Sequence, residues 1–237
     1  LPTTFGFTGW IAMTVGAEGN DVLMGDLVLR EEEVNPVMSA LLKNDLDVTA
    51  LHNHFFYEEP RLFFMHVYGM GKAIELAKAI KPALDIMGTL PVKGVHSVTL
   101  SGSRINAGTF DTAALDAIVG TKGSQLDGGV YKYVVGRPDL DIQDMDATIN
   151  ARMGLSSWAS LFGSDDDAVI AGDIAMVADE VTFVMKALRS HNIEVVAVHN
   201  HMTGTTPMIY FLHYWGEGKA ADLAKGFKAA IDATGKD

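Results

Sequence analysis

Histidine is concentrated in two segments of the chain that share one pattern. The first reads ALHNHFFYEEPRLFFMHVYGMGKA (residues 50–73) and the second reads AVHNHMTGTTPMIYFLHYWGEGKA (residues 197–220). Six of the eight histidines fall here, namely His52, His54, His66, His199, His201 and His213. Imidazole nitrogens bind Zn, Cu, Fe and Ni, and with carboxylate help Mn. Three protein ligands with one open position are typical of a catalytic rather than a closed structural metal site.

Strand geometry gives a reason for the three histidines of each segment to converge. Side chains alternate across a strand, so His52 and His54 share a face, and the return strand brings His66 beside them. The preceding helix carries Glu33 on its apolar face, where a buried carboxylate needs a partner. We therefore expect one divalent-metal site per segment. The expected ligands are His52, His54, His66 and Glu33 in the first site, and His199, His201, His213 and Glu180 in the second.

The ligand set leaves some alternatives open. Asp26 and Asp173 are second candidates for the carboxylate, because their strands are expected to neighbour those of His66 and His213. The chain has no cysteine, so the ion must be held by nitrogen and oxygen, which suits Zn, Cu, Fe or Mn. The alternative interpretation is that the histidines bind no metal and form a duplicated polar network that fixes the strand register.

The histidine segments belong to a longer internal duplication. A shift of 147 residues places residues 24–85 over residues 171–232 without a gap, and 26 of the 62 positions are identical. Gly25 and Asp26 match Gly172 and Asp173, and upstream Trp10 matches Trp158 if one residue is inserted. Two copies of one unit have therefore kept the same polar residues while most other positions changed.

Each copy predicts the same order of elements. A short apolar strand is followed by an amphipathic helix, two strands rich in aromatic and β-branched residues, and a second amphipathic helix. This order is the ferredoxin-like pattern. We expect an α+β protein made of two tandem ferredoxin-like (βαββα) repeats packed together. Residues 1–100 form the first repeat, whose N-terminal part is expected to be missing, and residues 101–237 form the second repeat with its preceding linker segment.

Composition excludes several classes of partner. The hydrophobic content of 48% and charged content of 20% indicate a globular protein. A net charge of −12 repels the phosphate backbone of nucleic acids and anionic membrane surfaces, so neither is expected as a partner. No apolar run is long enough to predict a transmembrane segment.

Several longer motifs resemble a known family. The stretch GDLVLREEEVNPVMSALLKNDLDVTALHNH (residues 25–54), together with MHVYGMGKA, GRPDL, SWASLFG and VVAVHNHM, is similar to the LppY/LpqO family of lipoproteins. The resemblance implies a secreted or cell-envelope location. It implies no reaction and no catalytic residue, and the chain has no cysteine that could carry a lipid anchor.

Three hypotheses about function follow. The first is an exported divalent-metal-binding protein, which would be a metal-dependent enzyme if the open position activates water or binds a substrate. The second is a structural or self-assembling envelope or extracellular module, a homo-oligomer or filament whose histidines only stabilise the fold. The third is a sensor that binds a small ligand in the cleft between the two halves.

Overall fold

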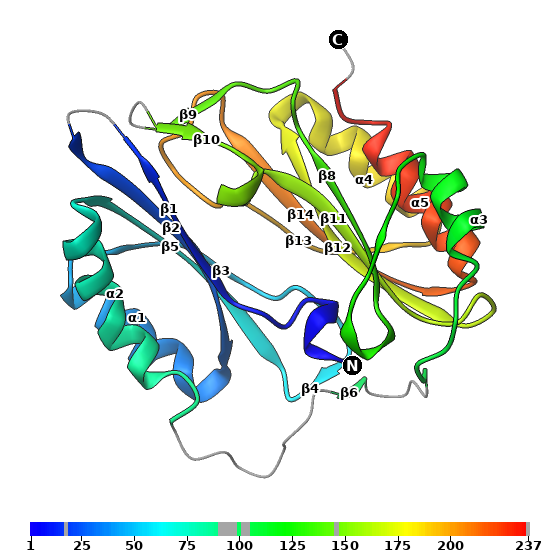
Figure 1. The fold of residues 1–237 in the computed structure, drawn as a ribbon, viewed down its shortest axis with the longest axis horizontal. Helices are drawn as coiled ribbons and strands as arrows, with labels where there is room; N and C mark the ends of the chain where they lie inside the picture. Colours follow the sequence, from blue (N-terminus) through cyan, green and yellow to red (C-terminus); the bar gives the residue numbers. More distant parts are fainter. Residues whose placement is uncertain (17–18, 90–98, 101–104, 145–146, 236–237) are drawn as a thin grey trace.

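The computed structural model describes residues 1–16, 19–89, 99–100, 105–144 and 147–235, and two β-sheets dominate it (Figure 1). The first sheet has the strand order β1-β2-β5-β3 and the second β13-β14-β12-β11-β8-β7. The strands of the first sheet are β1 (Trp10–Val15), β2 (Asp21–Arg30), β3 (Asp47–His52) and β5 (Leu62–Gly71). Those of the second are β7 (Ser124–Gln125), β8 (Tyr131–Gly136), β11 (Ser156–Gly163), β12 (Ala168–Val177), β13 (Glu194–His199) and β14 (Ile209–Gly218).

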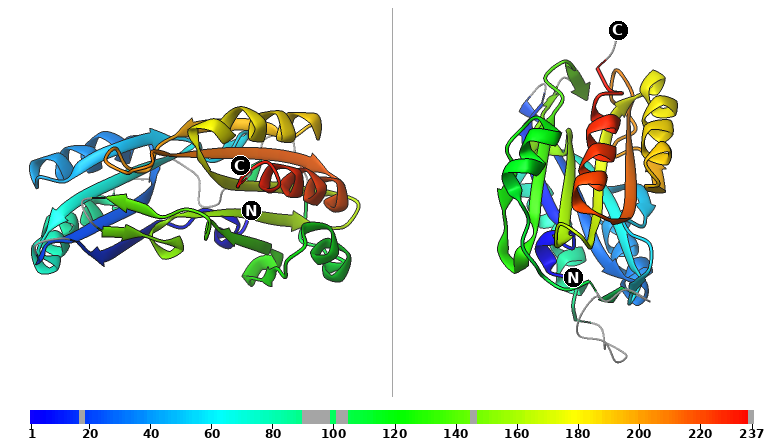
Figure 2. Two further views of the ribbon diagram at one scale, coloured as in Figure 1. Left: turned by 90° about the horizontal axis from the view of Figure 1, so that it is seen from above. Right: turned by 90° about the vertical axis from the view of Figure 1, so that its right-hand side faces the viewer.

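Helices cover the outer face of each sheet, so the molecule has four layers in the order helix, sheet, sheet, helix (Figures 1 and 2). The helices of the first half are α1 (Glu31–Lys43) and α2 (Ala73–Ile86), and those of the second are α3 (Thr112–Val119), α4 (Val181–Ser190) and α5 (Ala220–Ile231). Two small two-stranded sheets complete the fold: β4 (Glu58–Glu59) with β6 (Thr99–Leu100), and β9 (Ile142–Asp144) with β10 (Ala147–Ile149).

The two halves repeat the same arrangement, which confirms the α+β class and the duplication. The three strands of each repeat lie in the same order, which is β3-β5-β2 in the first half and β13-β14-β12 in the second. Beside β2 lies β1, and beside β12 lies β11. Each of these added strands is antiparallel to its neighbour and precedes it in the chain. The second sheet is extended beyond β11 by β8 and β7, whereas β1 ends the first sheet.

Apolar side chains on both faces of the central strands explain why these strands are almost entirely buried. One face packs against the helices, as Leu23 and Leu27 of β2 do with Val37 of α1. The other face packs against the opposite sheet, where Met24 of β2 meets Phe211 of β14. A second inter-sheet cluster is mostly aromatic and consists of Phe5, Phe55, Leu62, Phe64, Val130, Phe162, Val169, Ala171 and Trp215. The inner faces of the two sheets therefore pack together through two hydrophobic clusters.

The glycine before each repeated aspartate allows neighbouring strands to approach closely. A Cβ atom on Gly172 would collide with the backbone oxygen of Trp158 and the hydroxyl of Tyr214. That hydroxyl donates a 3.0 Å hydrogen bond to the same oxygen. The backbone of β12 must stay fixed here because Asp173 follows directly.

Replacing Gly172 by Ala should therefore destabilise the protein by about 3 kcal/mol, the upper part of the range for overpacking a core. For a chain of this size that corresponds to a fall in Tm of roughly 6–12 °C in a thermal melt. Gly136→Ala is the matched control, because no atom lies within 4 Å of a Cβ added there. Equal Tm values for the two variants would contradict the close approach at Gly172.

Across the described part of the chain, every helix is too short or too polar to cross a lipid bilayer.

Candidate metal centre

All six histidines of the repeated pattern lie between the two sheets. His66 lies on β5 and His213 on β14, while His52 and His199 end β3 and β13. His54 and His201 follow two residues after these strand ends. Each of the six side chains is buried or half-buried, and His66 and His213 are each only 1% exposed. The inner face of each sheet therefore presents its three imidazoles to the imidazoles of the other half.

The rings stack in pairs that join the two halves. His52 lies over His199, with ring centroids 3.7 Å apart. His54 lies 3.8 Å from His213, and the equivalent residues His201 and His66 lie 3.9 Å apart. The sequence predicted one separate site within each repeat, whereas the structure brings the six rings into a single cluster between the two halves.

Backbone carbonyls orient two of the rings. The Nδ1 atom of His66 lies 3.2 Å from the oxygen of Gly25, and that of His213 lies 3.1 Å from the oxygen of Gly172. A carbonyl oxygen only accepts, so each Nδ1 carries the proton and each Nε2 keeps a free lone pair. Metal-binding histidines commonly donate their second ring nitrogen to a backbone carbonyl in this way.

Most of the remaining nitrogens have no hydrogen-bond partner among the described residues, although they are buried. They are both ring nitrogens of His52, His54 and His201, and the Nε2 atoms of His66, His199 and His213. Buried polar atoms in proteins are nearly always satisfied, and an unpaired one costs free energy. So many in one place require an explanation, and a bound ion supplies one.

Two buried carboxylates adjoin the cluster. Asp26 on β2 pairs in register with His66, and Asp173 on β12 pairs with His213, as the sequence led us to expect. An oxygen of Asp26 lies 3.4 Å from Nε2 of His54, and an oxygen of Asp173 lies 3.8 Å from Nε2 of His201. Burial raises the pKa of both carboxyl groups, and the Asp26 charge raises that of Asp173 further. A cation in the cluster would offset this cost.

The imidazoles are held neutral, which is the form that binds metals. Burial lowers the pKa of His66 to about 3 and that of His199 to about 4. It also lowers the pKa of the other four rings, those of His52, His54, His201 and His213. No proton therefore has to be displaced from these nitrogens before an ion binds near neutral pH.

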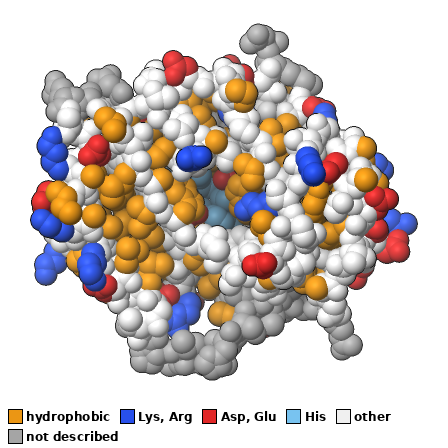
Figure 3. Space-filling view, in the orientation of Figure 1, with side chains coloured by type: hydrophobic (Ala, Val, Ile, Leu, Met, Phe, Trp, Pro, Cys, Tyr) orange, Lys and Arg blue, Asp and Glu red, His pale blue; other side chains and the backbone are white. Residues whose placement is uncertain are grey.

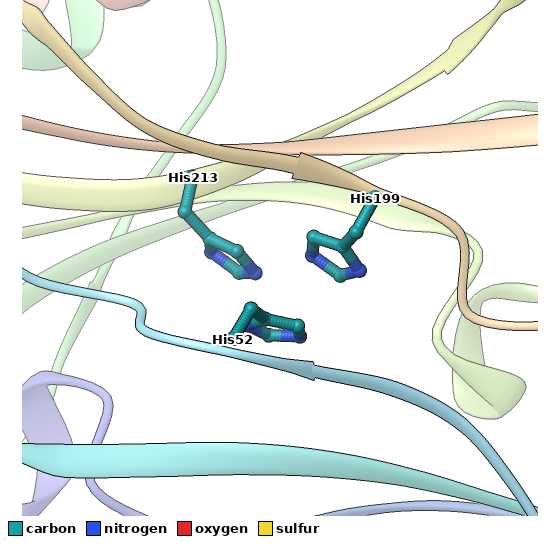
Figure 4. Close-up of side chains that lie close together, drawn as sticks. All are labelled: His52, His199 and His213. Atoms are coloured by element: carbon teal, nitrogen blue, oxygen red, sulfur yellow. The ribbon is translucent and has the colours of Figure 1, made fainter.

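Ligand atoms come within reach of one ion in groups of three that mix the two halves. Candidate nitrogens of His66, His199 and His201 lie within 4.8 Å of one another. The same holds for His52, His199 and His213, whose rings Figure 4 shows facing one another from the two sheets. Tetrahedral coordination at about 2.0–2.1 Å would need these nitrogens to move somewhat closer together.

The two glutamates predicted as metal ligands, Glu33 and Glu180, lie outside the histidine cluster and pair with arginines instead. Glu33 accepts a 2.9 Å hydrogen bond from the Arg30 backbone and pairs with the Arg30 guanidinium at 2.7 Å. Glu180 accepts from the Val177 backbone at 2.9 Å and pairs with Arg137 at 2.8 Å. Both close the first turn of a helix by satisfying free backbone N–H groups. Their burial alongside apolar residues thus has a structural cause.

A cavity of about 250 Å³ leads from the surface to the cluster. Figure 3 shows it as a hollow with histidine at its bottom and basic side chains at its rim. Asp26, Asp173, His54 and His201 line it together with both repeated tryptophans, Trp10 and Trp158. Lys132 and Arg152 also line it, and sequence reasoning missed both because neither belongs to the duplicated pattern.

Solved structures that resemble this chain include proteins of bacterial microcompartments. A microcompartment protein from Desulfitobacterium hafniense is 10% identical, covers 90% of this chain and 87% of its own, and gives a TM-score of 0.25. A fused permuted hexameric shell protein of the RMM microcompartment is 14% identical, with coverages of 95% and 94% and a TM-score of 0.25. EtuB from Clostridium kluyveri is 9% identical, with coverages of 95% and 85% and a TM-score of 0.26. TM-scores this low carry no conclusion about what this chain does. No curated protein matches the sequence.

A family model matches residues 1–86 and 113–233, and its description is Domain of Unknown Function (DUF1259). The resemblance to the LppY/LpqO lipoproteins is therefore wrong, since the family model that matches is a different one. The secreted or envelope location rested on that resemblance alone and is wrong with it. With most of its length covered by this model, the chain belongs to the family described as Domain of Unknown Function (DUF1259).

Proposed function

We propose that the chain binds divalent transition-metal ions in the histidine cluster between its two sheets. The observation that carries this proposal is the set of buried ring nitrogens without partners, which face one another beside two buried carboxylates. Nitrogen and carboxylate ligands without thiolate suit Zn, Cu, Fe or Mn. A core that only needed to be stable would be better served by apolar side chains at these positions.

The duplication indicates how the six histidines divide between two ions. His66, His199 and His201 lie within reach of one ion, with Asp173 beside His201. Their equivalents by the duplication are His213, His52 and His54, with Asp26 beside His54. In the structure the nitrogens close to those of His52 and His213 include one of His199, so the second ion would take His54 in place of His199. The ring spacings agree, because His213 lies 3.8 Å and 5.0 Å from His54 and His52, and His66 lies 3.9 Å and 5.3 Å from His201 and His199. Each ion would thus take the His-x-His pair of one half and the third histidine of the other, an arrangement we call the crossed site.

The cavity supports a catalytic rather than a closed structural role for these ions. Asp26, His54, Asp173 and His201 line it, so an ion held there would keep a coordination position open toward solvent. Such an ion lowers the pKa of a bound water or polarises a substrate oxygen. The reaction is therefore a metal-dependent one on a small molecule that enters this cavity.

Two expectations about architecture belong to the same proposal. Each half is a ferredoxin-like unit in permuted form, because the fourth strand of its sheet precedes the other three in the chain. The division of the chain into residues 1–100 and 101–237 assigns β8, which supplies Lys132, to the second unit.

Metal analysis of the purified protein tests the proposal. Protein prepared without chelators and reconstituted with Zn²⁺, Mn²⁺, Fe²⁺ or Cu²⁺ should retain about two ions per chain after gel filtration, measured by plasma mass spectrometry, because the crossed sites use all six rings. Protein that retains no ion of any of the four would contradict it.

A second candidate function is a self-assembling module whose histidines only stabilise the fold. The observation in its favour is a pair of equivalent exposed residues, Leu51 on β3 and Val198 on β13, which are each 42% exposed on edge strands. Exposed edge strands pair readily with other chains. Sedimentation velocity separates the two functions, because ordered oligomers of metal-free protein would favour this module.

A further inference from the structure

The cavity above the histidine cluster has walls suited to a flat molecule. Trp10 pairs in register with Asp26, and Trp158 pairs with Asp173, so each indole stands beside one of the buried carboxylates. A Cβ on Gly154 would lie 3.1 Å from the Trp10 ring, and one on Gly6 would lie 3.1 Å from the Trp158 ring. Glycine at these positions leaves room for both indoles, whose faces bind flat apolar groups.

Two cationic side chains, Lys132 and Arg152, line the cavity, and both come from the second half of the chain. Lys132 of β8 places its Nζ atom 4.2 Å from the centre of the Trp158 ring, and Arg152 lies in the segment before β11. Throughout the described ranges, no carboxylate forms an ion pair with either side chain. Burial lowers the pKa of Lys132. A half-buried cation without an anionic partner is costly, and an anionic ligand would remove that cost.

Lys132 belongs to the second half of the chain. There β8, which carries it, flanks β11, the strand of Trp158. The carboxylates Asp26 and Asp173 lie at the histidine end of the same cavity. The cavity therefore has a cationic side wall and a floor where the ions are proposed to bind.

We propose that this cavity binds a small organic anion with a flat, apolar body, such as an aromatic carboxylate. Its anionic group lies at Lys132 and Arg152, its body lies between Trp10 and Trp158, and its far end faces the crossed sites. A volume of about 250 Å³ is below the roughly 300–1,000 Å³ of pockets for drug-sized ligands, which limits the ligand to a small molecule. The far-end position rests on the proposed metal binding, whereas the anion contacts do not.

Benzoate is a suitable probe, and isothermal titration calorimetry of the full chain measures its binding. We expect saturable binding to the wild type, weakened about tenfold or more by Lys132→Met, because a charged hydrogen bond is lost. Benzyl alcohol, which lacks the charge, should bind similarly weakly. Lys186→Met is the matched control, since Lys186 is exposed on α4 and should leave benzoate binding unchanged. Arg152→Met is a second test that does not disturb the stack on Trp158.

The outcomes separate this inference from the proposed metal binding, because metal content is measured on each sample. Wild type with a full complement of metal that does not bind benzoate would overturn the anion site and leave the metal centre intact. Benzoate binding that neither Lys132→Met nor Arg152→Met weakens, in variants with a native circular dichroism spectrum, would also overturn it. Protein that retains no metal after reconstitution, yet binds benzoate through Lys132, would support the anion site while contradicting the proposed function.

Discussion

Replacing His54 and His66 together should abolish metal binding, whereas replacing His66 and His201 together should leave one ion per chain. The two double variants remove the same number of imidazoles. They differ because, in the proposed crossed sites, His54 and His66 hold different ions, while His66 and His201 hold the same one. Loss of one ligand from a site is expected to weaken its affinity for the metal by at least about 100-fold. This is more than the usual effect of replacing a residue that only contacts a metal ligand.

Metal content after reconstitution and gel filtration gives the result directly. Separate sites within each repeat would reverse the order of the two variants, since His54 and His66 would then share a site. Loss of all metal from both variants would instead indicate one ion bound by the whole cluster. His191→Ala is the control, because His191 lies at the end of α4 with its ring on the Ala187 carbonyl and should retain the full metal content.

Removing both ions should lower the Tm of the wild type by about 16–32 °C. An ion present at about 1,000 times its Kd stabilises the folded state by ~4 kcal/mol, so two such ions contribute ~8 kcal/mol. For a chain of this length each kcal/mol changes Tm by about 2–4 °C. The physical cause is that chelation leaves buried imidazole nitrogens and the carboxylates of Asp26 and Asp173 without a cation.

Differential scanning calorimetry with and without EDTA measures this shift, and dialysis against the chelator shows that the metal has left. The variant lacking His54 and His66 is the control, because its Tm should not respond to EDTA. An unchanged Tm in wild-type protein that has lost its ions would mean that the cluster is stable without them. The histidines would then serve the fold rather than a metal.

The sequence allowed the repeated architecture to be predicted because its signals are local. Apolar residues at helical spacing in residues 34–41 are matched by those in residues 181–188, and both stretches are helical. The polar residues conserved between the two copies identified the six histidines as a group. Each of them lies on a strand or within two residues of its end.

The role of the glutamates could not be separated from metal binding by sequence alone. Glu33 lies three residues after Arg30, which fits a capping role, but the same position also lies on the apolar face of the helix. Glu180 pairs with Arg137, a residue 43 positions earlier that no local pattern connects with it. A buried carboxylate therefore predicts a partner without saying whether that partner is an ion or a guanidinium.

The pairing of rings between the halves was equally beyond a reading of local patterns. Strand alternation shows which side chains share a face, but not which faces of two sheets meet. The contact of Thr49 with the backbone oxygen of His201, at 2.6 Å, joins residues 152 positions apart. Such contacts depend on how the two sheets stack, which is set by their whole inner surfaces.

Strand β8 has a consequence for how a ligand enters the cavity. Its Lys132 lies over the Trp158 ring, so the positive charge on this wall would draw the anionic end of an incoming molecule toward Trp158 and leave the opposite end facing the buried carboxylates.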